Sequence, residues 1–414
     1  MSRLGIYVQV PFCQTKCTYC NFHTGVVSAG RFSPYAEAVC REIRGHRELY
    51  RTAGVHWGSS DRTAANFEQG PEAFSKQSAQ RTQRREEEFV VDTVYIGGGT
   101  PSLLEPELLL RMMETIRGTL ATELSEVTLE ADPETVGPEK AAAWVEAGIN
   151  RVSFGVQSFS DKELAAAGRM HRRVDIYRAA AILREAGIRN ISFDLIAGLP
   201  HQTVESWKES LEELRKLEPE HVSVYLLEVD EGSRLGKELL SGGARYSAGA
   251  VPNDDEMADF YESARDFLGA AGYHHYEISN WAKPGCESRH NLKYWRREAY
   301  LGFGAGAHSF SGRQRWANAH DAAEYVGAIV AGRLPVEQLE PVTRVSALEE
   351  ELFLGLRQLD GIDVGKIERE YGVELEERFG PLETAGLIER EGGIVRLAPK
   401  RLSVSNEAFV ELMR

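Results

Sequence analysis

The chain has 414 residues, which is enough for more than one domain because domains commonly comprise roughly 100–200 residues. Its formal net charge of −15 at pH 7 argues against nucleic acid as a partner, since phosphates are bound through basic surfaces. The sequence shows neither the pattern of a secretory signal nor a run approaching the ~18 apolar residues of a membrane helix. We therefore expect a cytoplasmic protein without a transmembrane segment, in which clustered cysteines serve as ligands or catalysts more often than as disulfides.

The first predicted element is a strand that leads into a cysteine-rich loop. Apolar and polar residues alternate from Ile6 to Val10, the period of a strand, and Pro11 ends it. Three of the five cysteines follow in a C-x3-C-x2-C pattern: Cys13, Cys17 and Cys20. Structural zinc usually takes two separated pairs of ligands, whereas closely spaced thiolates hold iron–sulfur clusters. The single triplet therefore favours a cluster with one open iron over structural zinc completed by a distant histidine.

A helix is predicted to start at Ser33 and Pro34, because serine is a favoured N-cap and proline is favoured at the first helical position. Its apolar stripe includes Cys40, which we interpret as a core residue since buried free cysteine behaves as a small hydrophobe. Residues 53–89 mix Gly, Ser, Gln, Arg and Glu with little periodicity, which predicts a mobile surface insertion in preference to a functional loop.

From residue 89 onward strands and helices alternate, which is typical of βα units and a parallel sheet. Glycine ends two of the helices, at Gly148 and Gly187, directly before a new strand. Five further strands are predicted over residues 89–96, 127–130, 151–154, 191–196 and 221–226. With the strand at 6–10 they make six. We therefore predict an α/β fold with an incomplete (β/α)6 TIM-type barrel over residues 1–235, which the segment 236–340 completes.

Residues 341–414 are predicted to form a separate C-terminal domain. Helices are expected over 347–359 and 364–371, followed by residues 382–388 and an apolar ribbon at 393–397, an order like that of a winged helix. Winged helices often bind DNA, but the many glutamates of this segment favour a structural or docking role.

In a βα barrel the chemistry lies at the C-terminal ends of the strands. Here the strand ends carry small, polar or metal-binding residues, in chain order Cys13 to Cys20, Gly97 to Thr100, Glu130, Gln157, Asp194 and Glu228. The spacing of the three glycines is not that of the dinucleotide fingerprint. They allow a close approach of the backbone to a ligand, or they form a tight turn only.

In combination these motifs resemble the radical S-adenosylmethionine (SAM) superfamily and, within it, the oxygen-independent coproporphyrinogen III oxidase-like family. The resemblance covers nearly the whole chain outside residues 53–89. Besides the cysteine loop it rests on YIGGGTPS at 95–102, RVSFGVQSF at 151–159, GRMH at 168–171 and FDLIAGLP at 193–200.

The resemblance implies that the three cysteines ligate a [4Fe–4S] cluster whose open iron is chelated by SAM. It also implies a SAM pocket made of Tyr7, Tyr19, Gly98, Gly99, Thr100, Glu130, Gln157, Arg169 and Asp194. In this family, with an electron donor as partner, SAM is cleaved reductively to methionine and a 5′-deoxyadenosyl radical. Gln9 departs from the family pattern, which commonly has histidine there.

Two features are similar to the haem-chaperone branch of this family, called HemW. Cys20 is followed by Asn21 and Phe22 without the further cysteine of the oxidase branch, and only twelve residues precede Cys13. The segment HNLKYW at 290–295 matches the H-N-x-x-Y-W motif of the HemW branch. The resemblance implies that haem is the cargo and that it binds at His290, Tyr294 and Trp295. It also implies acceptor haem proteins as partners, and it is compatible with a peripheral contact to a membrane.

The residues alone leave the role of this motif open. A histidine in a loop with two aromatic side chains can ligate haem iron, with Cys286 as a second candidate contact, or it can pack beside an aromatic cluster. The alternative function is that of an oxygen-independent coproporphyrinogen III oxidase, which converts two propionate side chains to vinyl groups. Whether the chain is an enzyme is therefore left open, and a radical enzyme for another substrate is a third possibility.

Overall fold

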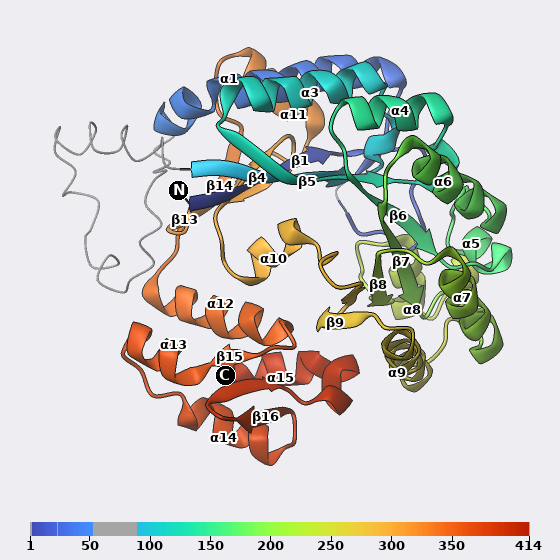
Figure 1. Ribbon diagram of the computed structural model, residues 1–414, viewed down its shortest axis with the longest axis vertical. Coiled ribbons are helices and arrows are strands. Elements are labelled where there is room, and N and C mark those ends of the chain that lie inside the picture. Colours follow the sequence, from blue (N-terminus) through green and yellow to red (C-terminus); the bar gives the residue numbers. More distant parts are fainter. Residues whose placement is uncertain (1, 23, 53–88, 414) are drawn as a thin grey trace.

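A computed structural model describes residues 2–22, 24–52 and 89–413 of the chain. In this part of the chain the main feature is one mixed sheet of twelve strands in the order β14-β13-β12-β11-β1-β4-β5-β6-β7-β8-β10-β9 (Figure 1). The end strands β14 and β9 of the described sheet do not pair with each other, so the barrel is open.

Seven neighbouring strands of the described sheet run parallel, from β11 beside β1 to β8. Their bounds are β11 (Tyr300–Phe303), β1 (Ser2–Val10), β4 (Phe89–Gly98), β5 (Thr122–Ala131), β6 (Arg151–Gln157), β7 (Asn190–Ala197) and β8 (His221–Leu226). The antiparallel strands at the edges are β9 (His274–Glu277), β10 (Asn280–Ala282), β12 (His308–Phe310), β13 (Gln314–Asn318) and β14 (Val336–Pro341). Because the seven strands are parallel, their C-terminal ends meet at one mouth of the barrel.

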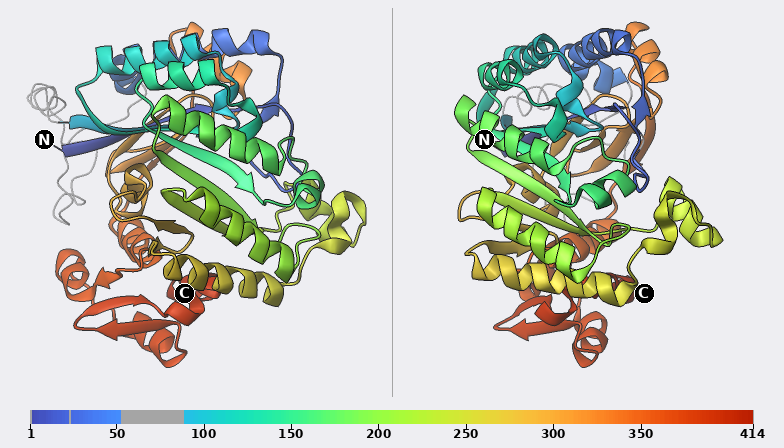
Figure 2. Two further views of the ribbon diagram at one scale, coloured as in Figure 1. Left: turned by 45° about the vertical axis from the view of Figure 1, so that its right-hand side comes forward. Right: turned by 90° about the vertical axis from the view of Figure 1, so that its right-hand side faces the viewer.

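Helices cover the outer face of this sheet (Figures 1 and 2). They are α1 (Phe32–Thr52), α3 (Pro106–Thr119), α4 (Pro138–Glu146), α5 (Asp161–Ala166), α6 (Arg173–Ala186), α7 (Val204–Leu217), α9 (Asp254–Ala270) and α11 (Ala322–Val330). Shorter elements at the strand ends are β2 (Phe12–Cys13), β3 (Gly25–Val26) and the 3-10 helices η1 (Ala29–Arg31), η4 (Pro101–Leu103) and η5 (Pro133–Thr135). A yellow-green lobe of α8 (Arg234–Ser241) and η6 (Arg245–Ala250) projects from the barrel in both views of Figure 2.

The two faces of the parallel sheet differ in polarity. On β1, Ile6, Val8 and Val10 are at most 1% exposed and join the helices in the main hydrophobic core. Burial of one such side chain stabilises the fold by about 1.5–3 kcal/mol. The residues between them, Tyr7 and Gln9, face the barrel interior, because successive side chains of a strand point to opposite faces. The barrel therefore has an apolar outer wall and a polar inner wall.

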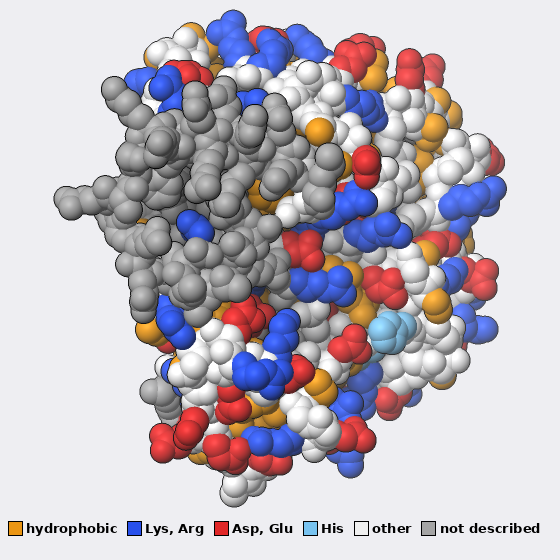
Figure 3. Space-filling model, turned by 60° about the vertical axis from the view of Figure 1, so that its left-hand side comes forward, with side chains coloured by type: hydrophobic (Ala, Val, Ile, Leu, Met, Phe, Trp, Pro, Cys, Tyr) orange, Lys and Arg blue, Asp and Glu red, His pale blue; other side chains and the backbone are white. Residues whose placement is uncertain are grey.

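The C-terminal unit packs below the barrel (Figure 1). It contains α12 (Arg344–Arg357), α13 (Val364–Tyr371), α14 (Glu376–Thr384), α15 (Ser405–Leu412), η7 (Pro399–Val404) and a three-stranded sheet of β15 (Ile362–Asp363), β17 (Ile394–Leu397) and β16 (Ile388–Glu391). In Figure 3 acidic and basic side chains alternate over this lower part of the molecule, and ion pairs such as Arg390–Glu376 join them. This mixed surface is not the basic face that nucleic acid requires.

The six predicted strands are all present and adjacent, and a seventh parallel strand, β11, lies beside β1 within the segment 236–340 that was expected to complete the barrel. Two details of the prediction are wrong. The first helix begins at Phe32 rather than at a Ser33 cap, because η1 leads into it directly and supplies its first turn. Residues Arg289–Trp295, expected in a loop, form the short helix α10. The predicted insertion at 53–89 lies, apart from Phe89, outside the described residues.

No helix among the described residues is both long enough and apolar enough to cross a lipid bilayer.

Candidate functional site

The cysteine loop lies at the mouth of the barrel and is held by segments distant in sequence. The amide of Thr18 donates to the carbonyl of Ala167, and the carbonyl of Thr18 accepts from the amide of Leu235 at the start of α8. Asn21 Nδ2 donates to Asp230 Oδ2 over 3.2 Å. The projecting lobe therefore braces the loop that carries the thiols.

The three thiols of this loop lie near one another but are not arranged as ligands. Burial raises the pKa of both Cys13 and Cys20. Charge repulsion raises each pKa further, from Cys20 in the case of Cys13 and from Cys17 in the case of Cys20. Across the described ranges, no three Cys, His, Asp or Glu side chains converge as metal ligands. Closely spaced thiols such as these can hold an iron–sulfur cluster as thiolates, and burial disfavours the thiolate forms of Cys13 and Cys20 in the absence of a cation.

The glycine turn after β4 is pressed against the end of β1. The amides of Gly99 and Thr100 donate to the carbonyls of Val10 (2.8 Å) and Phe12 (2.7 Å). A Cβ on Gly99 would lie 2.4 Å from the Phe12 carbonyl oxygen, so no side chain fits there. Gly98 has a φ of +115° and lies against the carboxamide of Gln9. The glycines thus join the turn to the cysteine-bearing segment, and Gln9 lies inside the site.

Glu130 stands at the end of β5 beside this turn. Its carboxylate accepts from the amide of Gly98 and from the hydroxyl of Tyr95, each over 2.8 Å. Burial raises the pKa of Glu130 to about 7 although both hydrogen bonds oppose the shift. Near neutral pH this carboxyl group is therefore divided between its protonated and charged forms, and a bound cation would favour the charged form.

Arg169 connects the cysteine loop to the neighbouring strands. Its guanidinium forms an ion pair with Asp132, donates to the Gly155 carbonyl over 2.9 Å, and lies 3.5 Å from Cys17 Sγ. Thr100 Oγ1 donates to the same Asp132 over 3.1 Å. Asp132 was not among the predicted site residues, although it follows Glu130 by two residues near the end of the same strand. Tyr95, in the strand that precedes the glycine turn, was not predicted either.

The remaining predicted SAM residues line the same mouth or the interior below it. Tyr19 packs against the hydrophobic cluster at the loop and near Arg169. Gln157 ends β6 with a φ of +63°, a left-handed conformation that is unusual for a residue with a side chain. Asp194 accepts from Ser153 Oγ over 3.2 Å in the interior, where burial raises its pKa. Tyr7 donates to Gln9 Oε1 over 2.6 Å. Glu228 is exposed beyond the end of β8.

His290, predicted as a haem contact, is fully buried at the opposite end of the barrel. Its Nδ1 lies 2.9 Å from Thr93 Oγ1 and its Nε2 lies 2.9 Å from the hydroxyl of Tyr294. Burial lowers its pKa to about 3, so the ring is neutral. Both ring nitrogens are occupied, which is the arrangement of a packing histidine. In this conformation neither nitrogen is available to iron.

Helix α10, which carries His290, closes the floor of the barrel. The amides of Arg289 and His290 both donate to the carboxylate of Glu126 over 2.9 Å. Gly5 leaves room for the helix, because a Cβ there would lie 3.0 Å from Lys293 and 3.1 Å from the His290 ring. Trp295 instead faces the C-terminal unit, with Arg357 4.6 Å above its ring. The motif therefore joins the barrel floor to the C-terminal unit.

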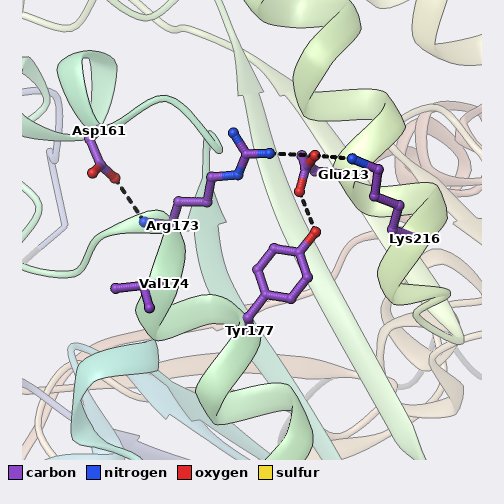
Figure 4. A pocket seen from close by; sticks show the side chains of 6 residues that line it. All are labelled: Asp161, Arg173, Val174, Tyr177, Glu213 and Lys216. Carbon is purple, nitrogen blue, oxygen red and sulfur yellow. Dashed lines mark hydrogen bonds and ion pairs between the residues drawn. The ribbon is translucent and has the colours of Figure 1, made fainter.

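One pocket, of about 480 Å³, lies on the outer helix layer between α5, α6 and α7 (Figure 4). Its buried Glu213 forms ion pairs with Arg173 and Lys216 and accepts from Tyr177. Since these groups satisfy one another, this pocket has a structural explanation.

The chain is similar to known protein families over most of its length. Residues 7–214 match the Radical SAM superfamily and residues 342–400 match the HemN C-terminal domain. The chain is similar to the heme chaperone HemW of Bacillus subtilis (strain 168), with 34% identity over 409 residues that cover 97% of each chain. It is also similar to the heme chaperone HemW of Lactococcus lactis subsp. lactis (strain IL1403), with 31% identity over 98% of this chain and 96% of the relative.

Among solved structures, the fold is similar to that of the radical SAM enzyme coproporphyrinogen III oxidase (HemN) from Escherichia coli. The TM-score is 0.79 with 20% sequence identity, over 99% of this chain and 90% of that chain. At this level of identity the likeness concerns the fold, and it confirms the predicted fold class.

Proposed function

This chain belongs to the radical SAM superfamily and, within it, to the HemW family of haem chaperones, and we propose that it binds a [4Fe–4S] cluster, SAM and haem and delivers haem to acceptor haem proteins. The observation that carries the proposal is the convergence at one barrel mouth of three clustered thiols with Arg169 and Glu130, in a chain whose nearly full-length relatives are named haem chaperones.

We propose that Cys13, Cys17 and Cys20 would hold the cluster. Arg169 Nη1 lies 3.5 Å from Cys17 Sγ, so a positive charge stands beside the site where the negatively charged cluster would lie. Because the thiols are not yet arranged as ligands, we expect the loop to adjust when iron binds.

For SAM, Glu130 and Arg169 are the residues placed to bind opposite charges. The carboxylate of Glu130 would attract the amino group, and the guanidinium of Arg169 would attract the carboxylate. Gln157 and Asp194 would complete the inner side of the pocket. When bound, the cluster and SAM would supply reductive chemistry with an electron from a partner. The protein's own part is to position SAM and to limit the access of water.

We propose that haem binds at the floor of the barrel, around α10. His290 can reach iron only if α10 leaves the floor, since both its ring nitrogens are engaged inside. Haem coordination by His290 therefore competes with closure of the barrel.

An anaerobic reconstitution tests the proposal. We expect the wild type to take up iron, to bind SAM, and to shift the Soret band of added haem, and then to restore the spectrum of an apo haem protein. Cys17→Ser should lose most of its iron, whereas Cys286→Ser, a partly exposed cysteine outside the loop, should keep it. A wild type that binds iron but neither binds nor transfers haem would contradict the chaperone function.

The same preparation tests the alternative function, that of an oxygen-independent coproporphyrinogen III oxidase. Sustained conversion of coproporphyrinogen III to protoporphyrinogen, with SAM and a reductant, would show an oxidase instead. This function is considered because the set of residues at the barrel mouth would serve either activity.

A further inference from the structure

The segment that carries the three thiols also carries an exposed apolar patch. Phe22, Val26 and Val27 are 67%, 59% and 38% exposed. Val26 of β3 pairs with Cys13 of β2, and the backbone of Phe22 hydrogen-bonds to the thiol of Cys20. Apolar side chains that gather on a surface, with polar groups around them, mark sites where another protein binds. The patch lies directly beside the thiols.

The same segment is a basic stretch of an acidic protein. Asp and Glu make up 63 of the 414 residues, yet none occurs in residues 1–36. Lys16 lies within the cysteine loop, where its charge lowers the pKa of Cys20 against the larger effect of burial. In the described part of the chain the Lys16 side chain has no ion-pair partner. It therefore presents an uncompensated positive charge beside the thiols.

Two arginines flank the patch. Arg31 is exposed in η1, directly before Phe32, whose ring stacks on that of Phe12 at a centroid distance of 5.0 Å. Arg234 of the projecting lobe is exposed and donates to the backbone carbonyl of Lys16. Neither guanidinium group forms an ion pair with a residue that the structure describes. Together with Lys16, these arginines surround the apolar patch with positive charge.

The lobe beside the patch has carboxylates as well as basic side chains. Asp230 accepts from Asn21 Nδ2 over 3.2 Å and from the amide of Gly232 over 2.5 Å, so it is held against the loop. Glu228 and Glu231 are exposed. The lobe is therefore of mixed charge, and the positive character of the surface comes mainly from the cysteine loop and η1.

We propose that a small acidic protein that carries single electrons docks on this surface and reduces the bound cluster there. The docking surface consists of Lys16, Phe22, Val26, Val27, Arg31 and Arg234. An apolar centre with a charged rim is the common make-up of a protein–protein interface, and opposite charges speed the encounter of the two partners. This inference rests on the proposed function, which requires an electron from a partner.

The place of the docking surface suits such a redox encounter. Electron-transfer partners commonly meet through small interfaces, below about 1,200 Å² of buried surface, and separate quickly. Because electron transfer slows steeply with distance, the carrier has to lie over the cysteine loop itself. The haem site is proposed at the opposite end of the barrel, so an acceptor haem protein and the carrier do not compete for one surface.

The test uses flavodoxin, an acidic flavin protein, as the probe, with the reconstituted full-length chain. The anionic hydroquinone of its flavin gives one electron to the cluster and becomes the neutral semiquinone, and no covalent bond forms or breaks. The variant Lys16→Glu with Arg31→Glu is compared with the wild type and with a control, Lys366→Glu with Arg401→Glu. The control residues are exposed on the C-terminal unit. Both variants change the net charge equally, so only the place of the change differs.

We expect the variant of the docking surface to bind flavodoxin about ten-fold more weakly, or worse, at about 50 mM salt. The difference should shrink at about 500 mM salt, where the charges are screened. Reduction of the cluster by flavodoxin should slow by a similar factor. Reduction by dithionite, a small reductant that needs no docking, should keep the wild-type rate, and the control should match the wild type throughout.

Two further measurements separate docking from damage to the loop. Arg31→Glu alone, outside the cysteine run, should keep the iron content and weaken binding by a smaller factor, and unchanged binding by this variant would overturn the inference. Slower reduction by dithionite would show a structural role and overturn it too. A wild type that binds haem but not flavodoxin would overturn the docking surface while the chaperone function stands. A wild type that takes up neither iron nor haem would reject both.

Discussion

Glu42 on α1 is a buried carboxyl group behind the barrel mouth. It accepts from the amide of Gly304 (2.9 Å), from Asn318 Nδ2 (2.7 Å) and from the hydroxyl of Tyr325 (2.6 Å). These bonds fasten the loop after β11 to α1. Burial nevertheless raises the pKa of Glu42 from 4.5 to about 7.

Because the pKa of Glu42 is raised in the folded chain, the free energy of unfolding depends on pH. Between pH 4.5 and 7 the folded chain keeps a proton that the unfolded chain has lost, so the free energy of unfolding falls as pH rises through this window and is level above it. The full effect is about 3 kcal/mol, of which about 1 kcal/mol falls between pH 6 and 8.

We predict that Glu42→Gln removes this pH dependence. From pH 6 to pH 8 the wild type should lose about 1 kcal/mol of unfolding free energy relative to the variant, measured by urea denaturation. Glu48→Gln, an exposed glutamate on the same helix, is the control and should run parallel to the wild type. Parallel curves for Glu42→Gln would mean that Glu42 is charged throughout this range.

Some residues of the candidate site could be predicted from the sequence and others could not. The cysteines were predictable because their spacing alone indicates a shared ligand. Asp132 and Tyr95 were not, because their roles depend on contacts with Arg169 and Glu130 that only the register of β4, β5 and β6 creates.

At the scale of elements, α10 works as a plug whose closure depends on a few buried hydrogen bonds. Its seven residues are too few for a clear helical period, which explains why the sequence indicated a loop. Its place in the barrel is fixed by Glu126, Thr93 and Gly5, three residues more than 160 positions away from it. The predicted haem motif and the barrel wall are therefore one structural unit.

We predict that Thr93→Val loosens this plug. The near-isosteric change leaves His290 Nδ1 buried without its partner, which costs about 1–3 kcal/mol. Hydrogen–deuterium exchange over residues 289–295 should become faster, and haem association should become faster if α10 must open. Thr115→Val, which removes a hydroxyl that donates to Arg111 on α3, is the matched control. Unchanged exchange in α10 would show that Thr93 does not hold the plug closed.

Some strands of the sheet could be predicted from the sequence and one, β11, could not. Strands from β4 to β8 follow one another along the chain, and each is an apolar run ended by turn residues, so local pattern sufficed. β11 was not predicted as a strand because it has only four residues and pairs with β1 across almost 300 positions, as in Gly5 with Tyr300. Local periodicity carries no information about such a pairing.

At the scale of the whole molecule, Arg297 connects the barrel to the C-terminal unit. It lies two residues after the end of α10, is 8% exposed, and contacts Glu350 (2.9 Å) and Glu351 (3.2 Å) of α12 and the hydroxyl of Tyr371 of α13 (3.3 Å). Movement of α10 is therefore coupled to the position of this unit.

We predict that Arg297→Met weakens the attachment of the C-terminal unit to the barrel. Removing Arg297 takes the ion-pair partner of Glu351 away, whereas Glu350 keeps its ion pair with Arg315, so we expect a cost of about 1.5–3 kcal/mol, as for the loss of a hydrogen bond to a charged group. Calorimetry should show a lower melting temperature or a separate transition for residues 342–413. Arg396→Met, in an exposed pair on the C-terminal hairpin, should cost less than about 1 kcal/mol. If both variants melt like the wild type, the ion pairs of Arg297 do not join the units.

The position of β1 between β4 and β11 has a consequence for synthesis of the chain. During translation β1 emerges first, but its β11 neighbour follows only after nearly 300 residues. At roughly 5–20 residues per second, one edge of β1 waits on the order of 15–60 s before it is covered. An uncovered strand edge invites pairing with other chains, so the nascent protein depends most on chaperones before residue 303 leaves the ribosome.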